Sequence, residues 1–210
     1  HEIFSEKFND LLDGTAAGIM AFEGKIYFAC IPKIWMLSDD DGDLKADEHR
    51  VIQDGFGVRV SFSGHDLNGF ALGPDGRLYT TIGDRGFSVT TREGREYKFP
   101  NQGAILRFEP DGSNMEVVHT GLRNPKEIAF DQFGTGITVD NNSDQGDRAR
   151  VVFLLEGADS GWRMGHQVLH SFHKTAGIPD RPINQWMQEK MWEPVNDAQP
   201  GHIVPPMLNL

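Results

Sequence analysis

The chain has 210 residues, of which 38% are hydrophobic and 24% charged, and its formal net charge is −11. An acidic chain repels phosphate backbones and anionic lipids, so we expect no nucleic-acid partner and no docking to an anionic membrane. No apolar run approaches the roughly 20 residues of a membrane-spanning helix, and the 24 glycines and 11 prolines favour a turn-rich, all-β chain over a helical bundle.

The first predicted unit covers roughly residues 15–60. Two apolar strands, 18–22 and 25–29, flank a turn at Glu23-Gly24, and further strands are expected at 33–37 and 50–52. A glycine turn between short apolar runs is typical of a β-hairpin. Cys30 follows the second strand and is the only cysteine, so we expect a small buried thiol and no internal disulfide.

An acidic loop joins the last two strands of this unit. Asp39, Asp41 and Asp43 alternate along the chain, and Asp47 follows. Alternating carboxylates supply the hard oxygen ligands that Ca²⁺ prefers, although Leu44 stands where such loops usually have glycine. A structural Ca²⁺ site and a solvated acidic hairpin loop both remain open.

Two further units repeat the pattern, at roughly 65–120 and 122–165. Their turns contain Gly76 and Gly134, and their strands are expected at 69–72, 77–82, 104–108, 116–119, 127–130, 136–139 and 150–155. Four strands repeated about every 50 residues are typical of a β-propeller blade. The sequence therefore predicts an all-β fold, a β-propeller with four-stranded blades, of which three are visible.

The remaining segment, 166–210, is expected to be an irregular insertion that leads to the next blade. A short helix is predicted near 184–191, and 203–208 has the pattern of a strand entering that blade. Closed propellers need about four to eight blades, and the chain begins with His1 instead of Met, so we expect a partial propeller from a longer or processed protein.

Polar residues that could carry chemistry follow the predicted strands of the second unit. His65 precedes its first strand, after a predicted strand at 58–62, and Asp84 and Arg85 follow its second strand. An Asp beside a His fixes its tautomer and raises its basicity, so His65 is a candidate general base oriented by Asp84. The alternatives are a structural or exposed His65 and an Asp84 that only caps a turn.

The third unit offers two more candidates. Arg123 and Asn124 precede its first strand, and such a pair suits an anionic, oxygen-rich ligand. Asp140 and Asn141 follow its second strand and begin an oxygen-rich candidate cation segment. A surface turn and an Asx-rich loop are the simpler interpretations of these two segments.

The stretch from Gly64 to Trp162 resembles a known family. The matching motifs are Gly73-Pro74-Asp75-Gly76-Arg77-Leu78-Tyr79 running into Ile82-Gly83-Asp84, Leu122-Arg123-Asn124-Pro125, Asn142-Ser143-Asp144 and Ser160-Gly161-Trp162. In order and spacing they resemble the soluble glucose/sorbosone dehydrogenases that depend on pyrroloquinoline quinone (PQQ). The loop 39–47 and the ending 203–206 are similar to a planctomycete and verrucomicrobial branch, the membrane-bound dehydrogenase type.

This resemblance implies a six-bladed propeller that oxidises a sugar, polyol or aldehyde by hydride transfer to PQQ. It implies that His65 is the catalytic base and Asp84 its support. Arg123, Asn124 and Arg85 are implied to contact the cofactor, and the backbone carbonyls of Asp140 and Asn141 to hold Ca²⁺. It further implies a periplasmic or secreted protein with a c-type cytochrome as possible electron acceptor.

The sequence departs from the family pattern at three places. Asp140-Asn141 stands in place of Gly-Pro, Lys126 in place of a glutamine, and Arg85 in place of another glutamine. Two other functions therefore stay open. One is a non-catalytic propeller that binds glycans or protein partners, and the other is a calcium-dependent lactonase-type propeller in which His65 has no special role.

Overall fold

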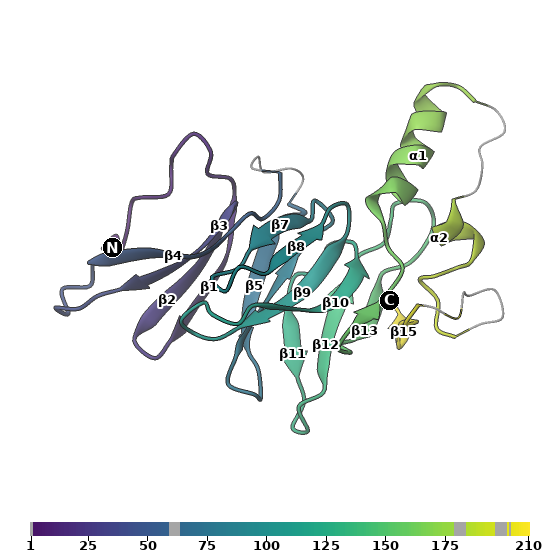
Figure 1. Ribbon diagram of the computed structural model, residues 1–210. Helices are drawn as coiled ribbons and strands as arrows, with labels where there is room; N and C mark the ends of the chain where they lie inside the picture. Colours follow the sequence, from purple (N-terminus) through teal and green to yellow (C-terminus); the bar gives the residue numbers. More distant parts are fainter. Residues whose placement is uncertain (1, 59–63, 179–183, 196–200, 202) are drawn as a thin grey trace.

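The computed structural model describes residues 2–58, 64–178, 184–195, 201 and 203–210. All its strands except those of one small hairpin form three consecutive sheets (Figure 1). The first sheet contains β1 (Ala16–Phe22), β2 (Lys25–Cys30), β3 (Lys33–Ser38) and β4 (Glu48–Asp54). The second contains β5 (Leu67–Leu72), β6 (Leu78–Ile82), β9 (Gly103–Phe108), β10 (Glu116–Leu122) and β14 (Ala158–Asp159). The third contains β11 (Ile128–Phe130), β12 (Gly136–Asp140), β13 (Arg150–Phe153) and β15 (Leu208–Asn209).

The sheets are arranged as the blades of a β-propeller. In the first sheet each strand pairs antiparallel with the next along the chain. The first strands of the three sheets lie together, because β1 packs against β5 and β5 packs against β11. Inner strands that meet in this way surround a common axis, so the predicted all-β propeller fold is confirmed for three blades.

Apolar side chains fill the spaces between neighbouring sheets. The cluster between the first two sheets includes Tyr27, Ile34, Leu78 and Phe108, and a second cluster between the next two includes Ile105 and Val152. All five residues of β6 are buried because this strand lies in the middle blade, which is covered on both faces. The expected burial of Cys30 is confirmed, and burial raises the pKa of its thiol.

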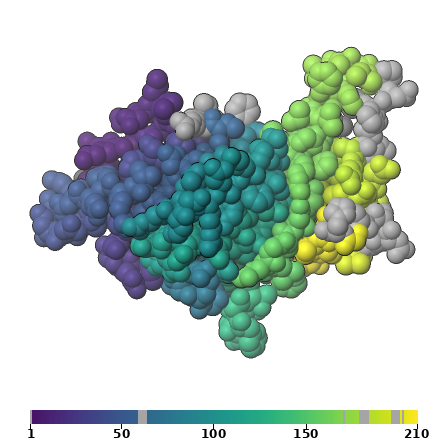
Figure 2. Space-filling model, viewed as in Figure 1, coloured from purple at the N-terminus to yellow at the C-terminus, as the bar shows by residue number. Residues whose placement is uncertain are grey.

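Three parts of the chain differ from the prediction. The hairpin of β7 (Phe87–Thr90) and β8 (Glu96–Phe99) was not predicted. The segment after 165 is less irregular than predicted, because it contains α1 (Met164–Thr175), which projects from the body in Figure 2. The short helix predicted near 184–191 is present as α2 (Gln185–Gln188). The strand predicted at 58–62 lies almost wholly outside the described residues.

The end of the chain also has a different place from the one expected. It does not enter a new blade: Leu208 and Asn209 pair with Val151 and Arg150 as the outer strand of the third sheet. Pro205 and Pro206 have no backbone N–H to donate to a ladder, which shortens the strand to its last residues. The third blade therefore obtains its fourth strand from a segment distant in sequence.

A buried histidine links the second sheet to the segment after it. The ring of His119 is fully buried; its Nε2 lies 2.9 Å from Ser160 Oγ, and its Nδ1 accepts from Leu155 N–H at 3.3 Å. An Nδ1 that accepts and an Nε2–H that donates define a neutral ring. Burial, reinforced by the Arg150 charge, lowers the pKa of His119 to about 4.

This histidine predicts a loss of stability in mild acid. The unfolded chain takes up the His119 proton near pH 6.5, whereas the folded chain resists it until about pH 4. The stabilisation of about 3 kcal/mol is therefore complete above pH 6.5 and is lost as pH falls towards 4. Urea unfolding of wild type and His119→Gln at several pH values measures this, and equal pH slopes in the two proteins would contradict it.

Candidate functional site

The loop that carries His65 is fixed by close contact with the next loop. A β-carbon at position 83 would lie 2.5 Å from the carbonyl carbon of His65, so only glycine fits there. The Gly83 N–H also donates to the Asp66 carbonyl at 3.0 Å. The loop after β6 thus fixes the position of the His65 backbone, which lies just before β5.

His65 and Asp84 form a buried pair. Nδ1 of His65 lies 3.0 Å from Oδ1 of Asp84, and the two residues are 9% and 1% exposed. A carboxylate facing Nδ1 holds the ring proton on that nitrogen, which leaves Nε2 as the basic nitrogen. The structure thus brings together the two residues predicted as base and orienting acid.

The second oxygen of Asp84 is also occupied. Oδ2 accepts a hydrogen bond from Trp162 Nε1 at 2.9 Å. The guanidinium of Arg85 lies 4.0 Å from Oδ1, and its Nη1 lies 2.7 Å from the sulfur of Met164 at the start of α1. Arg85 therefore sits at the edge of the His65–Asp84 pair, where it was predicted to meet a ligand.

Arg123 and Asn124 form the next part of the site. Nη2 of Arg123 donates to Asp144 Oδ2 and to Gln167 Oε1, both at 2.9 Å, while its guanidinium lies 5.7 Å from the ring of Trp162. Its Nε is buried and has no hydrogen-bond partner among the residues that the structure describes. Both residues of the predicted pair are buried, and Arg123 lies beside Trp162.

Lys126 adds a cation to the same region. Its Nζ donates to the Gly64 carbonyl at 2.6 Å and to Asn68 Oδ1 at 3.1 Å. Burial lowers the pKa of the Lys126 ammonium, an effect that the Asp66 charge opposes. The lysine ties the loop after β10 to the loop that carries His65.

Asp140 is the centre of the Arg123-Asn124 loop. Its fully buried carboxylate accepts from the backbone N–H groups of Arg123, at 2.9 Å, and Asn124, at 2.7 Å, and from Nη2 of Arg150 at 2.8 Å. Because these donors already use its oxygens, the Asp140 carboxylate is not free to bind a cation. A cation at this segment would therefore bind backbone carbonyls, as the resemblance implies. Oδ1 of the adjacent Asn141 is buried and lacks a partner among the described residues.

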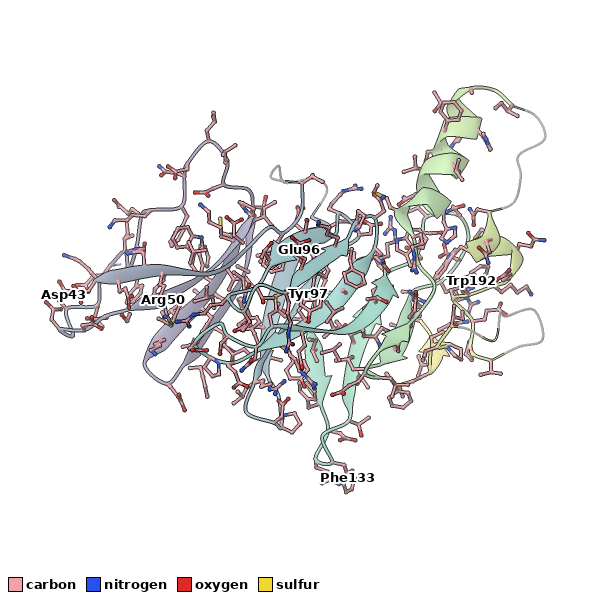
Figure 3. The ribbon with its side chains drawn as sticks, viewed as in Figure 1. Asp43, Arg50, Glu96, Tyr97, Phe133 and Trp192 are labelled. Carbon is pink, nitrogen blue, oxygen red and sulfur yellow. The ribbon has the colours of Figure 1, made fainter. Side chains whose placement is uncertain are left out.

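The acidic loop lies elsewhere in the molecule. Asp39, Asp41 and Asp43 each place an oxygen within 4.8 Å of the others, whereas Asp47 accepts the backbone N–H of Asp40 at 2.7 Å. Figure 3 shows Asp43 at the end of the molecule opposite Trp192. The structure thus groups three of the four predicted ligands, and Ca²⁺ binding there stays a prediction.

A family model described as "Domain of unknown function (DUF7133)" matches residues 3–192. The chain belongs to this family. The comparison with curated proteins found no match.

Solved structures similar to the DUF7133 chain include sugar dehydrogenases. One is the PQQ-bound form of aldose sugar dehydrogenase from Streptomyces coelicolor, with 21% identity and a TM-score of 0.48 over 66% of this chain and 42% of that one. Another is a putative glucose dehydrogenase from Thermus thermophilus, with 21% identity and a TM-score of 0.49 over 68% and 47%.

A third structure is a family AA12 carbohydrate-active enzyme from Trichoderma reesei, with 12% identity and a TM-score of 0.51 over 68% of this chain and 42% of that one. The DUF7133 chain spans less than half the length of these three solved chains. At 12% identity the likeness to this third structure supports the propeller fold and nothing more. Among the described residues, no helix is long and apolar enough to cross a membrane.

Two residues of the DUF7133 site were not found from the sequence. Arg150 begins β13, and its charge gave no sign of burial, yet it is 1% exposed and pairs with its cross-strand neighbour Asp140. Trp162 belonged to a recognised motif, but nothing local indicated that its N–H meets Asp84. The Arg150 contact depends on the pairing register of β12 with β13, and the Trp162 contact joins residues 78 positions apart, so no short-range pattern indicated either.

Proposed function

We propose that this chain is the base-bearing part of a PQQ-type oxidoreductase propeller that oxidises a sugar, polyol or aldehyde. The buried His65–Asp84 pair, with 3.0 Å between Nδ1 and Oδ1, is the observation that carries the proposal. A general base must be held in one tautomer and partly shielded from water, and this pair has both properties. The same proposal places the protein in the periplasm or outside the cell.

The chain's own residues suit proton transfer. Nε2 of His65 takes the hydroxyl proton of the substrate, and the Asp84 carboxylate stabilises the imidazolium that results. PQQ, when bound, supplies the acceptor for the hydride that leaves the substrate carbon.

Two buried atoms fit such a cofactor and its cation. Nε of Arg123 is a buried donor without an acceptor, and Oδ1 of Asn141 is a buried acceptor without a donor, among the described residues. A quinone or carboxylate oxygen would satisfy the first, and Ca²⁺ held by backbone carbonyls of the 140–141 segment would also bind the second. Arg123, Asn124 and Arg85 are thus the residues that would hold PQQ, and the 140–141 segment would hold Ca²⁺.

A glycan- or partner-binding propeller is the second candidate. The charge of Arg123 is already paired with Asp144 at 2.9 Å, and Lys126 is bound to backbone and amide oxygens. Cations that are paired within the protein offer less to the carboxylates of PQQ. A lactonase-type centre has less support, because the described residues hold a group of three acidic or histidine ligands only at Asp39, Asp41 and Asp43.

Reconstitution separates the candidates. The protein is incubated with PQQ and Ca²⁺, cofactor binding is followed by quenching of tryptophan fluorescence, and reduction of an artificial dye is measured with a panel of aldoses, polyols and aldehydes. We expect saturable PQQ binding and substrate-dependent dye reduction. Glycan binding on an array without either signal would overturn the oxidoreductase proposal and favour the second candidate.

A further inference from the structure

We propose that Trp162 is a positioning residue for His65: its indole N–H fixes the Asp84 carboxylate, and that carboxylate fixes the imidazole. This inference deepens the proposed function by naming what controls the base. It rests on that function for its meaning in turnover, while its main test needs no cofactor.

The geometry around Asp84 is that of a clamped carboxylate. Oδ1 lies 3.0 Å from His65 Nδ1, and Oδ2 lies 2.9 Å from Trp162 Nε1. Asp84 is 1% exposed and Trp162 is 0% exposed, so water does not compete freely for either bond. Rotation of the carboxylate would break both contacts at once, and its plane is therefore fixed by the two rings.

Trp162 is itself held from several sides. Its backbone N–H donates to the Gly121 carbonyl at 2.9 Å, and its ring meets those of Trp186 at 5.1 Å and His166 at 5.7 Å, edge to face. The Arg123 guanidinium lies 5.7 Å from the ring. A fully buried indole packed in this way points its N–H in one direction, towards Asp84.

Removing the indole N–H should strengthen the electrostatic attraction between the Asp84 carboxylate and the protonated His65 ring. The donor shares part of the carboxylate charge, and without it more of that charge faces Nδ1 and favours the imidazolium. The other charged groups near the pair come from the loops before β5 and after β6 and β10, and the Trp162→Phe change removes none of them. They are Asp66, Arg85, Arg123 and Lys126.

Trp186 offers a matched control. Its Nε1 also donates to a buried carboxylate, Oδ2 of Asp147, at 2.9 Å, and it is 2% exposed within the same aromatic cluster as Trp162. A Trp-to-Phe change at either position removes one indole–carboxylate bond and similar ring volume. Only the change at 162 touches the partner of His65.

The test is an NMR titration of ¹⁵N-labelled histidine in the protein without cofactor, for wild type, Trp162→Phe and Trp186→Phe. We expect the His65 midpoint to rise by about half a unit or more in Trp162→Phe and to stay within error in Trp186→Phe. An unchanged midpoint in Trp162→Phe, or equal shifts in both variants, would overturn the inference.

A second measurement covers the case in which Trp162→Phe does not fold. In the wild type, the Nε1–H resonance of Trp162 should move with pH at the same midpoint as His65, while that of Trp186 should not. A Trp162 resonance that ignores the His65 titration would also overturn the inference. Because neither readout involves turnover, absence of dye reduction would count against the proposed function alone.

Discussion

Replacing His65 by glutamine is expected to lower kcat for dye-coupled substrate oxidation by at least about 100-fold. Glutamine keeps a side-chain amide that can reach Asp84, but it has no nitrogen able to take a proton at neutral pH. PQQ affinity should change little, because the residues proposed to hold the cofactor are Arg123, Asn124 and Arg85. Steady-state kinetics and a PQQ titration on the same preparation measure both quantities.

His49 supplies the control for this experiment. It lies on β4 of the first sheet and its Nε2 meets Ser5 Oγ at 2.7 Å, away from the Asp84 pair. His49→Gln should turn over at close to the wild-type rate. Turnover in His65→Gln within a few-fold of wild type would show that His65 is not the base, whatever the cofactor does.

Replacing Asp140 by asparagine is expected to cost about 3–5 kcal/mol of unfolding free energy, because it leaves the buried Arg150 guanidinium without its charged partner. The two residues are 0% and 1% exposed and lie 2.8 Å apart. The asparagine amide would also present N–H groups to the backbone donors of Arg123 and Asn124, which need acceptors. Chemical denaturation of the two proteins gives the difference directly.

An exposed ion pair makes the matched control. Glu96, labelled in Figure 3, pairs with Lys98 at 2.8 Å, but both side chains are more than half exposed. Glu96→Gln should leave the free energy of unfolding nearly unchanged, since water screens such pairs. Equal costs for Asp140→Asn and Glu96→Gln would mean that Asp140 is not the structural centre of the Arg123-Asn124 loop.

The strands could be predicted because their signals are local. The apolar runs around Gly24, Gly76 and Gly134 give hairpins, and in the structure each of these turns joins two strands where the pattern placed them. A glycine at a turn and alternating apolar residues act over a few positions, so they need no knowledge of the rest of the chain. The repeat of such hairpins then indicated blades.

The helix α1 and the strand β15 were not predicted, because what determines them is not local in the sequence. The hydrophobic side chains of α1 include Val168, Leu169 and Phe172, which are half exposed or more, so the helix buries little of its apolar surface against the rest of the described chain. Leu208 and Asn209 become a strand only because β13 offers them an unpaired edge. Both outcomes depend on what the rest of the fold places nearby.

The candidate site likewise has a part that local sequence predicts and a part that depends on the tertiary structure. The sequence alone supplied its residue types and their places at strand ends: His65 before β5, Asp84 after β6, and Arg123 and Asn124 before β11. Only the tertiary structure decided that Asp84 meets both His65 and Trp162, and that Arg150 crosses to Asp140. His65 meets Asp84, and Arg150 meets Asp140, where neighbouring strands of one sheet pair, whereas Trp162 reaches Asp84 from the segment after β14. These bonds depend on strand register and on burial, which only the assembled sheets provide.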